Sequence, residues 1–208
     1  EWAGIDPENG DPLWYKDEVD ANKNPTGKRV TTNDYGSADY YYVDKSSLPK
    51  VYGGFNTSLS WKGFDLSAIF AYSIGGYIYN RDVTMILHNG SLEGRDWSTE
   101  ILRRWTPDNR YTDVPALSTT SNNWNSASTR FLQNNSYMRL KNLTLSYNLP
   151  KQWISKLSLS SVQVYVQGDN LFTIHRNQGL DPEQGITGIT YYRYPAMRTI
   201  SGLSLIHI

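Results

Sequence analysis

The fold prediction starts from FDLSAIFAYSI, residues 64–74, in which apolar and polar side chains alternate. The even positions are apolar or aromatic throughout, whereas the odd positions include Asp65, Ser67 and Ser73. Successive side chains of a β-strand point to opposite faces of its sheet. This period of two therefore predicts a strand with one apolar face.

Three more stretches carry the same pattern. Residues 51–61 alternate immediately upstream, and Lys62-Gly63 is a connection short enough for a β-hairpin. Downstream, residues 142–149 alternate until Pro150, which cannot donate to a ladder, and residues 162–172 begin with valines set between polar side chains. With a last strand expected from Arg193, these stretches predict an all-β, antiparallel fold.

Alternation alone fits two architectures, because a soluble β-sandwich also has one inward face and one face in water. The connections favour a transmembrane β-barrel. They are short at residues 62–63 and modest at residues 150–160, but long at residues 80–130 and intermediate at residues 176–192. Outer-membrane barrels have short periplasmic turns and long extracellular loops, whereas long structureless loops are uncommon in compact soluble domains.

Composition excludes several classes of function. The chain has 20 lysines and arginines against 20 aspartates and glutamates, so it lacks the basic surface that nucleic-acid binding needs. It has no cysteine, and its three histidines (His88, His175 and His207) are far apart, so we expect no metal site and no cofactor. No apolar run is long enough for a transmembrane helix. The chain opens at Glu1 without a targeting signal, and we expect it to be a fragment.

The long connection at residues 80–130 holds the candidate contact residues, which are Trp97, Trp105, Tyr111 and Trp124. Exposed aromatic rings beside charged side chains could stack on sugar faces or anchor a protein partner. The alternative is that these rings pack the loop against itself, or cap a short helix at residues 98–104. Ser98 or Thr99 would then be its N-cap.

A near-repeat, GIDPENG at residues 4–10 and GLDPEQG at residues 179–185, has the chemistry of a turn. Proline fixes φ, aspartate accepts hydrogen bonds from nearby amides, and glycine adopts positive φ. The carboxylates could also serve Ca²⁺ binding or acid–base catalysis, but each copy lacks further ligands or a partner. No nucleophile motif and no carboxylate pair for a glycosidase stands out, so we expect no enzyme.

A series of short stretches points to a known family. They are LPKVYGGF at 48–55, WKGFDLS at 61–67, RWT at 104–106, YMRLKNLTLSY at 137–147, VYVQGDNLFT at 164–173, GLDPE at 179–183, and YP at 194–195 with RT at 198–199. In this order, and over nearly the whole chain, they resemble the C-terminal part of the barrel of SusC-like TonB-dependent transporters.

The resemblance implies a plugged barrel of about 22 strands in the Gram-negative outer membrane. Such a transporter imports glycans or peptides with a SusD-like lipoprotein, and the TonB complex drives it through an N-terminal region that this chain lacks. The chain would supply the last few strands, in contact with outer-membrane lipid, and their extracellular loops. The alternative function is a soluble or secreted carbohydrate-binding β-sandwich, in which Trp97, Trp105 and Trp124 form a stacking platform.

Three regions are expected along the chain. Residues 1–48 are an extracellular loop region with a strand remnant, residues 49–202 are barrel strands with the long loop 80–130, and residues 203–208 are a separate tail. After Ile200 the apolar parity slips, because Leu203 and Leu205 fall on the opposite face, and the final residue is not the aromatic one usual in the family. LSLIHI is also the in-frame translation of a transposase-adapter end from sequencing libraries, so we expect residues 203–208 to be non-native.

Overall fold

The computed structural model describes residues 1–88, 94–118, 123–177, 179, 181–183 and 185–207. The chain divides into two units: unit 1 comprises residues 1–45, 78–133 and 189–192, and unit 2 comprises residues 46–77, 134–188 and 193–208. Three positions named in the sequence predictions lie outside the described residues. They are Leu180 and Gln184 of the second Asp-Pro turn, and Ile208 of the tail.

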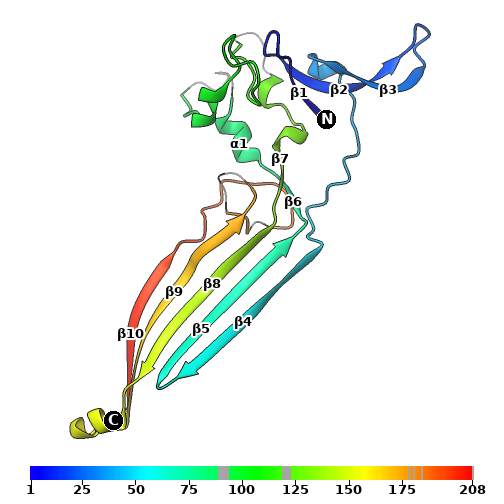
Figure 1. Ribbon diagram of the computed structural model, residues 1–208. Coiled ribbons are helices and arrows are strands. Elements are labelled where there is room, and N and C mark those ends of the chain that lie inside the picture. Colours follow the sequence, from blue (N-terminus) through cyan, green and yellow to red (C-terminus); the bar gives the residue numbers. More distant parts are fainter. Residues whose placement is uncertain (89–93, 119–122, 178, 180, 184, 208) are drawn as a thin grey trace. The chain divides into compact units, whose positions relative to one another are not determined.

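Unit 2 is built on a five-stranded antiparallel sheet of order β10-β9-β8-β5-β4 (Figure 1). Its strands are β4 (Val51–Trp61), β5 (Phe64–Ile74), β8 (Tyr137–Asn148), β9 (Ser161–His175) and β10 (Thr199–His207). A short helix α2 (Lys151–Ile154) and a 3-10 turn η5 (Ser155–Leu157) connect β8 to β9. The strands predicted at 51–61 and 64–74 are confirmed at those bounds.

The last strand begins later than predicted. β10 starts at Thr199 and not at Arg193. Pro195 has no N–H to donate, and the N–H of Ala196 is bound by the Asp181 carboxylate at 2.7 Å instead of by a neighbouring strand. The backbone before Thr199 therefore makes no ladder with β9.

A tight turn joins β4 to β5, as the sequence predicts. Trp61 pairs with Phe64, and the two residues between them, Lys62 and Gly63, have φ angles of 47° and 88°. Positive φ at both central positions is the requirement of a type I′ turn, whose twist matches that of the paired strands.

Replacing Gly63 should therefore impair assembly of the hairpin. Gly63→Val places a branched side chain at positive φ, at a cost of about 1–2 kcal/mol, and its Cβ would lie 3.1 Å from the carbonyl oxygen of Asn148. We expect less of the full-length protein to resist SDS unfolding at room temperature. Lys62→Asn is the matched control, since asparagine accepts positive φ. Equal losses in both variants would contradict this explanation.

The two faces of the sheet differ in chemistry. Cross-strand pairs such as Leu66 with Leu145, and Leu145 with Val166, place apolar side chains on one face. The alternate pairs, such as Ser67 with Thr144, place polar side chains on the other. The exposed large side chains of the apolar face are Val51, Phe55, Leu59, Trp61, Phe64, Leu66, Ile74, Leu145, Val164, Val166, Phe172, Ile174, Ile200 and Ile206.

A β-bulge at Lys141 changes which residues of β8 share a face. Ile69 pairs with Asn142, but the next residue, Phe70, pairs with Leu140, so Lys141 is an extra residue in the ladder. Arg139 consequently pairs with Ala71, an odd position of β5, and lies on the polar face.

The change of parity predicted in the last strand is confirmed. Leu203 pairs with Tyr165 and Leu205 pairs with Gln163, so both leucines lie on the polar face, while Ser204 pairs with Val164 on the apolar face. The adapter origin of residues 203–208 stays a prediction, and the genomic codons at this locus test it.

Unit 1 contains a three-stranded antiparallel sheet that the sequence did not predict. It consists of β1 (Trp2–Ile5), β2 (Pro12–Val19) and β3 (Pro25–Thr32), in that order. Its other elements are η1 (Tyr35–Ser37), α1 (Arg81–Ile86), η2 (Thr99–Arg103), η3 (Asn123–Asn125) and η4 (Thr129–Phe131). Two short strands, β6 (Tyr77–Tyr79) and β7 (Leu132–Asn134), pair with each other where the chain passes between the two units.

The long connection at 80–130 is folded around its own core. Leu87, Ile101, Val114 and Trp124 form a buried hydrophobic cluster in unit 1. The predicted helix near 98–104 is present as the 3-10 turn η2, and its N-cap is Ser98, whose side chain accepts the Glu100 N–H at 3.3 Å. In the described part of the chain, no helix combines the length and apolar character needed to cross a membrane.

Candidate functional site

The apolar face of the sheet is exposed and not packed into a core. Leu59 of β4 is 66% exposed, and Leu145 of β8 is 47% exposed. At the hairpin end the rings of Phe64 and Tyr147 pack with their centroids 4.4 Å apart. Among the described residues of unit 2, no second sheet covers this face. Soluble monomers rarely expose a continuous apolar patch of this kind, so the face is suited to a nonaqueous environment.

The polar face carries hydrogen bonds between neighbouring strands. Asn142 of β8 donates to Asp169 of β9 at 2.8 Å, and Gln163 of β9 donates to the Ser146 hydroxyl at 3.2 Å. Asn148 donates to Asp65 of β5 at 2.9 Å. These side chains satisfy one another and can still exchange hydrogen bonds with water. This face is therefore suited to an aqueous interior.

An ionic cluster lies at the end of the polar face farthest from the hairpin turn. Arg139 is only 4% exposed, and its guanidinium donates to Asp181 at 2.5 Å, to Glu183 at 2.7 Å and to the Thr173 hydroxyl at 2.9 Å. Lys141 also binds Glu183, at 2.5 Å. The planar fork of arginine suits contact with two carboxylates at once. The cluster joins the second Asp-Pro turn to β8.

The first copy of the near-repeat forms the predicted turn, with the Gly10 N–H bound to the Asp6 carbonyl oxygen at 2.8 Å, and the described residues of the second copy share its aspartate-to-amide bond. The Asp6 carboxylate accepts the Glu8 N–H at 2.9 Å, and the Asp181 carboxylate accepts the Glu183 N–H, also at 2.9 Å. The second copy additionally binds Arg139, a contact that the sequence reading missed. Arg139 and Lys141 come just before the strand predicted at 142–149, and the observed strand β8 begins earlier and includes them. Two cations so close to a strand were the available signal for a carboxylate partner.

The cluster should resist mild acid. Burial alone would raise the pKa of Asp181, but hydrogen bonds from the amides of Ala196 and Glu183, together with Arg139, lower it below its usual 3.8. A carboxylate whose pKa is lower in the folded than in the unfolded state stabilises the fold at any pH above the unfolded-state pKa. That stabilisation is lost as the pH falls through the folded-state pKa. We therefore expect the 181–183 turn to remain protected from proteolysis at about pH 5 and to be released only below about pH 3.8. Release already near neutral pH would contradict this.

The four predicted contact residues have different environments in unit 1. Trp124 is 1% exposed and belongs to the buried cluster, so for this residue the packing alternative applies. Trp97 is partly exposed and packs edge-on against His88. Trp105 donates its indole N–H to the carbonyl oxygen of Pro7 at 3.1 Å. Tyr111 is 94% exposed and is the member best placed for external contact.

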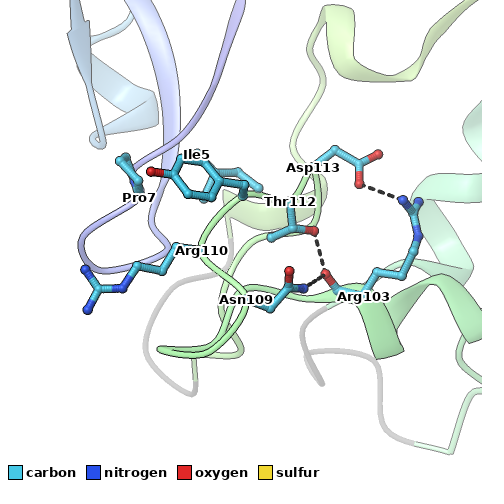
Figure 2. Close-up of a pocket in the computed structure, with 8 residues that line it drawn as sticks. Ile5, Pro7, Arg103, Asn109, Arg110, Thr112 and Asp113 are labelled. Carbon is cyan, nitrogen blue, oxygen red and sulfur yellow. Dashed lines mark hydrogen bonds and ion pairs between the residues drawn. The ribbon is translucent and has the colours of Figure 1, made fainter.

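Tyr111 lies in a groove of about 640 Å³ together with Ile5, Pro7, Arg103, Asn109, Arg110, Thr112 and Asp113. Figure 2 shows the Asn109 and Thr112 side chains converging on the backbone carbonyl of Arg103, at 3.0 and 2.5 Å. Asp113 pairs with the Arg103 guanidinium at 3.2 Å. The Arg110 side chain extends away from that pair. One side of the groove is therefore held in place by hydrogen bonds and an ion pair, and Arg110 provides an accessible positive charge.

Arg130 joins two backbone segments of the long connection at residues 80–130. Its guanidinium donates to the carbonyl oxygens of Trp124 and Asp113, each at 3.0 Å, and lies 5.0 Å from the ring centroid of Trp2. Removal from water lowers the pKa of Arg130 to about 10, while the charge of Asp113 opposes the shift. The group therefore stays cationic at neutral pH and can hold both segments.

The described residues contain no group of three or more histidine, aspartate or glutamate side chains arranged to hold a metal ion. In unit 1, the buried Asp82 carboxylate accepts the Tyr192 N–H at 3.1 Å. Asp82 therefore serves to anchor residues 189–192 to that unit.

Comparison with curated proteins shows clear relatives. The chain is 34% identical over 164 residues to TonB-dependent receptor P3 of Formosa agariphila, which covers 73% of this chain and 16% of the relative. It is 29% identical over 196 residues to TonB-dependent receptor SusC of Bacteroides thetaiotaomicron, covering 92% of this chain and 19% of the relative. The chain therefore spans less than a fifth of the length of either receptor. No family model matches it.

Solved structures show the same relationship. The RagAB peptide transporter matches with a TM-score of 0.80 and 36% identity, covering 99% of this chain and 22% of the matched chain. The RagAB peptide importer in its open-open state matches with a TM-score of 0.80 and 34% identity, covering 100% of this chain and 22% of the matched chain. These relatives are receptors and transporters, not enzymes.

Proposed function

The chain belongs to the SusC-like TonB-dependent receptors, and we propose that it forms the last strands of a closed outer-membrane barrel through which a TonB-dependent transporter imports glycans or peptides. The observation that carries the proposal is the two-faced sheet. Its exposed apolar face is suited to lipid, and its hydrogen-bonded polar face is suited to a water-filled interior.

The strand dimensions support this role. β4 and β5 have 11 residues each, which is the length that a tilted strand needs to cross the hydrocarbon layer. β4 and β10 stand at the two edges of the sheet, and each has one neighbour among the described strands. In the barrel, strands from the rest of the receptor would pair with both edges, since an unpaired edge cannot lie in lipid.

The decisive experiment expresses the full-length receptor in its own host and separates the membranes. We expect the receptor in the outer-membrane fraction, with mobility in SDS gels that changes on heating, and we expect loss of growth on its nutrient when TonB is deleted. A receptor recovered in the soluble fraction without detergent would instead support the carbohydrate-binding sandwich.

Unit 1 is proposed to lie on the extracellular side and to contact a SusD-like lipoprotein or the imported ligand. Tyr111 and the partly exposed Trp97 and Trp105 are the proposed contact residues. Aromatic side chains that become buried on binding often carry much of the affinity of an interface.

Tyr111→Ala should therefore weaken retention of the lipoprotein. The expected loss is about tenfold in affinity, because a buried aromatic anchor is worth more than about 1 kcal/mol. Retention is measured by co-purification of the lipoprotein with the tagged receptor. Tyr40→Ala is the matched control, since Tyr40 is also almost fully exposed in unit 1 but does not line the groove. Equal retention by the two variants would remove Tyr111 from the contact.

A further inference from the structure

The connection between β9 and β10 is hydrogen-bonded to other parts of unit 2 at several points. We call its unit 2 part, residues 181–183, 185–188 and 193–198, the return segment. Asn135 donates to the carbonyl oxygen of Pro182 at 2.8 Å, and Ser47 donates to that of Ile186 at 2.9 Å. Asn170 donates to that of Met197 at 3.1 Å. The donors come from three parts of unit 2, so the segment is fastened along its length.

The strongest of these attachments is ionic. Arg139 binds Asp181 and Glu183, which stand two residues apart in the turn, and Lys141 binds Glu183 as well. The side chains of Arg139 and Asp181 are both almost fully buried. Removing one partner of a buried pair leaves the other charge without compensation, so the attachment is sensitive to single changes.

The face on which this attachment lies follows from the register. Arg139 pairs with Ala71 and with Thr173, and its guanidinium bonds to the Thr173 hydroxyl at 2.9 Å. Ala71 is an odd position of β5, in line with Ser67 and Asp65. The return segment is therefore fastened to the polar face and not to the apolar one.

We propose that Arg139 is a positioning residue of the transport path, which holds the return segment across the polar face so that this segment narrows the interior of the barrel. This inference rests on the proposed function, because it takes the polar face to line the interior. Residues at this end of β8 and β9 are then screened from the passing solute by the return segment.

The test uses the full-length receptor in its outer membrane. Pro182 is fully buried, and the chain has no cysteine, so Pro182→Cys reports release of the segment through labelling by a membrane-impermeant maleimide. Tyr194→Cys, at an exposed position of the same segment, reports labelling that does not depend on release. Sensitivity of the cells to vancomycin reports widening of the path.

Arg139→Gln should accelerate labelling at position 182 by about tenfold, the change expected when a charged hydrogen bond is lost, and should increase vancomycin sensitivity. Arg139→Lys keeps the charge and should restore much of the protection. Arg198→Gln is the matched control, because Arg198 lines a groove of unit 2 together with Arg139 and Asp181 but makes no ion pair among the described residues.

If Arg139→Gln fails to assemble, the double variant Asp181→Asn with Glu183→Gln tests the same attachment from the loop side. Unchanged labelling in a correctly assembled variant would overturn the positioning role. Faster labelling with unchanged vancomycin sensitivity would overturn the narrowing. Absence of the wild-type receptor from the outer membrane would instead defeat the proposed function, so the two failures are distinguishable.

Discussion

Leu145→Arg in the full-length receptor is expected to remove most of the correctly assembled protein from the outer membrane. Leu145 is the ninth of the 12 residues of β8 and lies on the apolar face, between Leu66 and Val166. An arginine on the lipid face costs about 2–4 kcal/mol at the bilayer midplane and less toward the interfaces. Even a cost of about 1–2 kcal/mol is a large fraction of the stability of a folded protein. The measurement is the amount of heat-modifiable receptor in the outer-membrane fraction.

Thr144→Arg is the matched control for this prediction. Thr144 is the adjacent residue, and it lies on the polar face between Ser67 and Gln167. In a water-filled interior its new charge keeps its hydration, so we expect assembly close to that of the wild type. If the two variants assembled equally badly, the assignment of the apolar face to lipid would be wrong.

Arg130→Ala is expected to destabilise the folded loop region of unit 1 by about 3 kcal/mol. The substitution removes two hydrogen bonds from a charged donor, which join the backbones of Trp124 and Asp113, and a cation–π contact with Trp2. Hydrogen exchange measures the loss directly. The Trp105 amide, which donates to Val114, and the Asn80 amide, which donates to Phe131, should exchange about a hundredfold faster.

Arg110→Ala provides the comparison for Arg130. Arg110 belongs to the same loop, and its Nε donates to the carbonyl oxygen of Pro107 at 3.3 Å. Its removal should leave exchange at Trp105 and Asn80 unchanged. An Arg130→Ala receptor with wild-type exchange at both amides would show that the buried cluster holds the loop without this arginine.

The strands of unit 2 could be predicted because their signal is local. Each side chain from Phe64 to Ile74 reports its face through its own polarity, and the turn at Lys62-Gly63 fixes the register of the hairpin. The same local rule detected the change of parity at Leu203. The assignment of one face to lipid needed more, because a sandwich would show the same alternation.

The contacts that organise the loops could not be predicted in this way. Arg139 meets its carboxylates across 42 and 44 positions of sequence, and nothing within β8 specifies which loop will return to it. The sheet of unit 1 was missed because its strands show little alternation of apolar and polar side chains: β3, for example, contains Val30 as its single large apolar residue. The stability of the sheet comes in part from Trp14, which packs edge-on against Trp2 and Tyr35.

The candidate contact residues show the same limit. Trp124 and Tyr111 look alike in the sequence, as aromatic residues near charges in one long loop. Trp124 is buried because Leu87, Ile101 and Val114 converge on it from three separate segments. Tyr111 has no such neighbours in that cluster and stays exposed. Only tertiary contacts separate the two.

The extra residue at Lys141 acts as a phase shift in β8. Downstream of it the odd positions, such as Leu143, face the apolar side, whereas upstream the odd position Arg139 faces the polar side. Deleting Lys141 would restore a uniform alternation and turn the Arg139 guanidinium to the apolar face of the sheet. Homologues should therefore accept insertions and deletions in the loops but not at Lys141. A sequence alignment with a gap at this position would assign the arginine to the wrong face of the sheet.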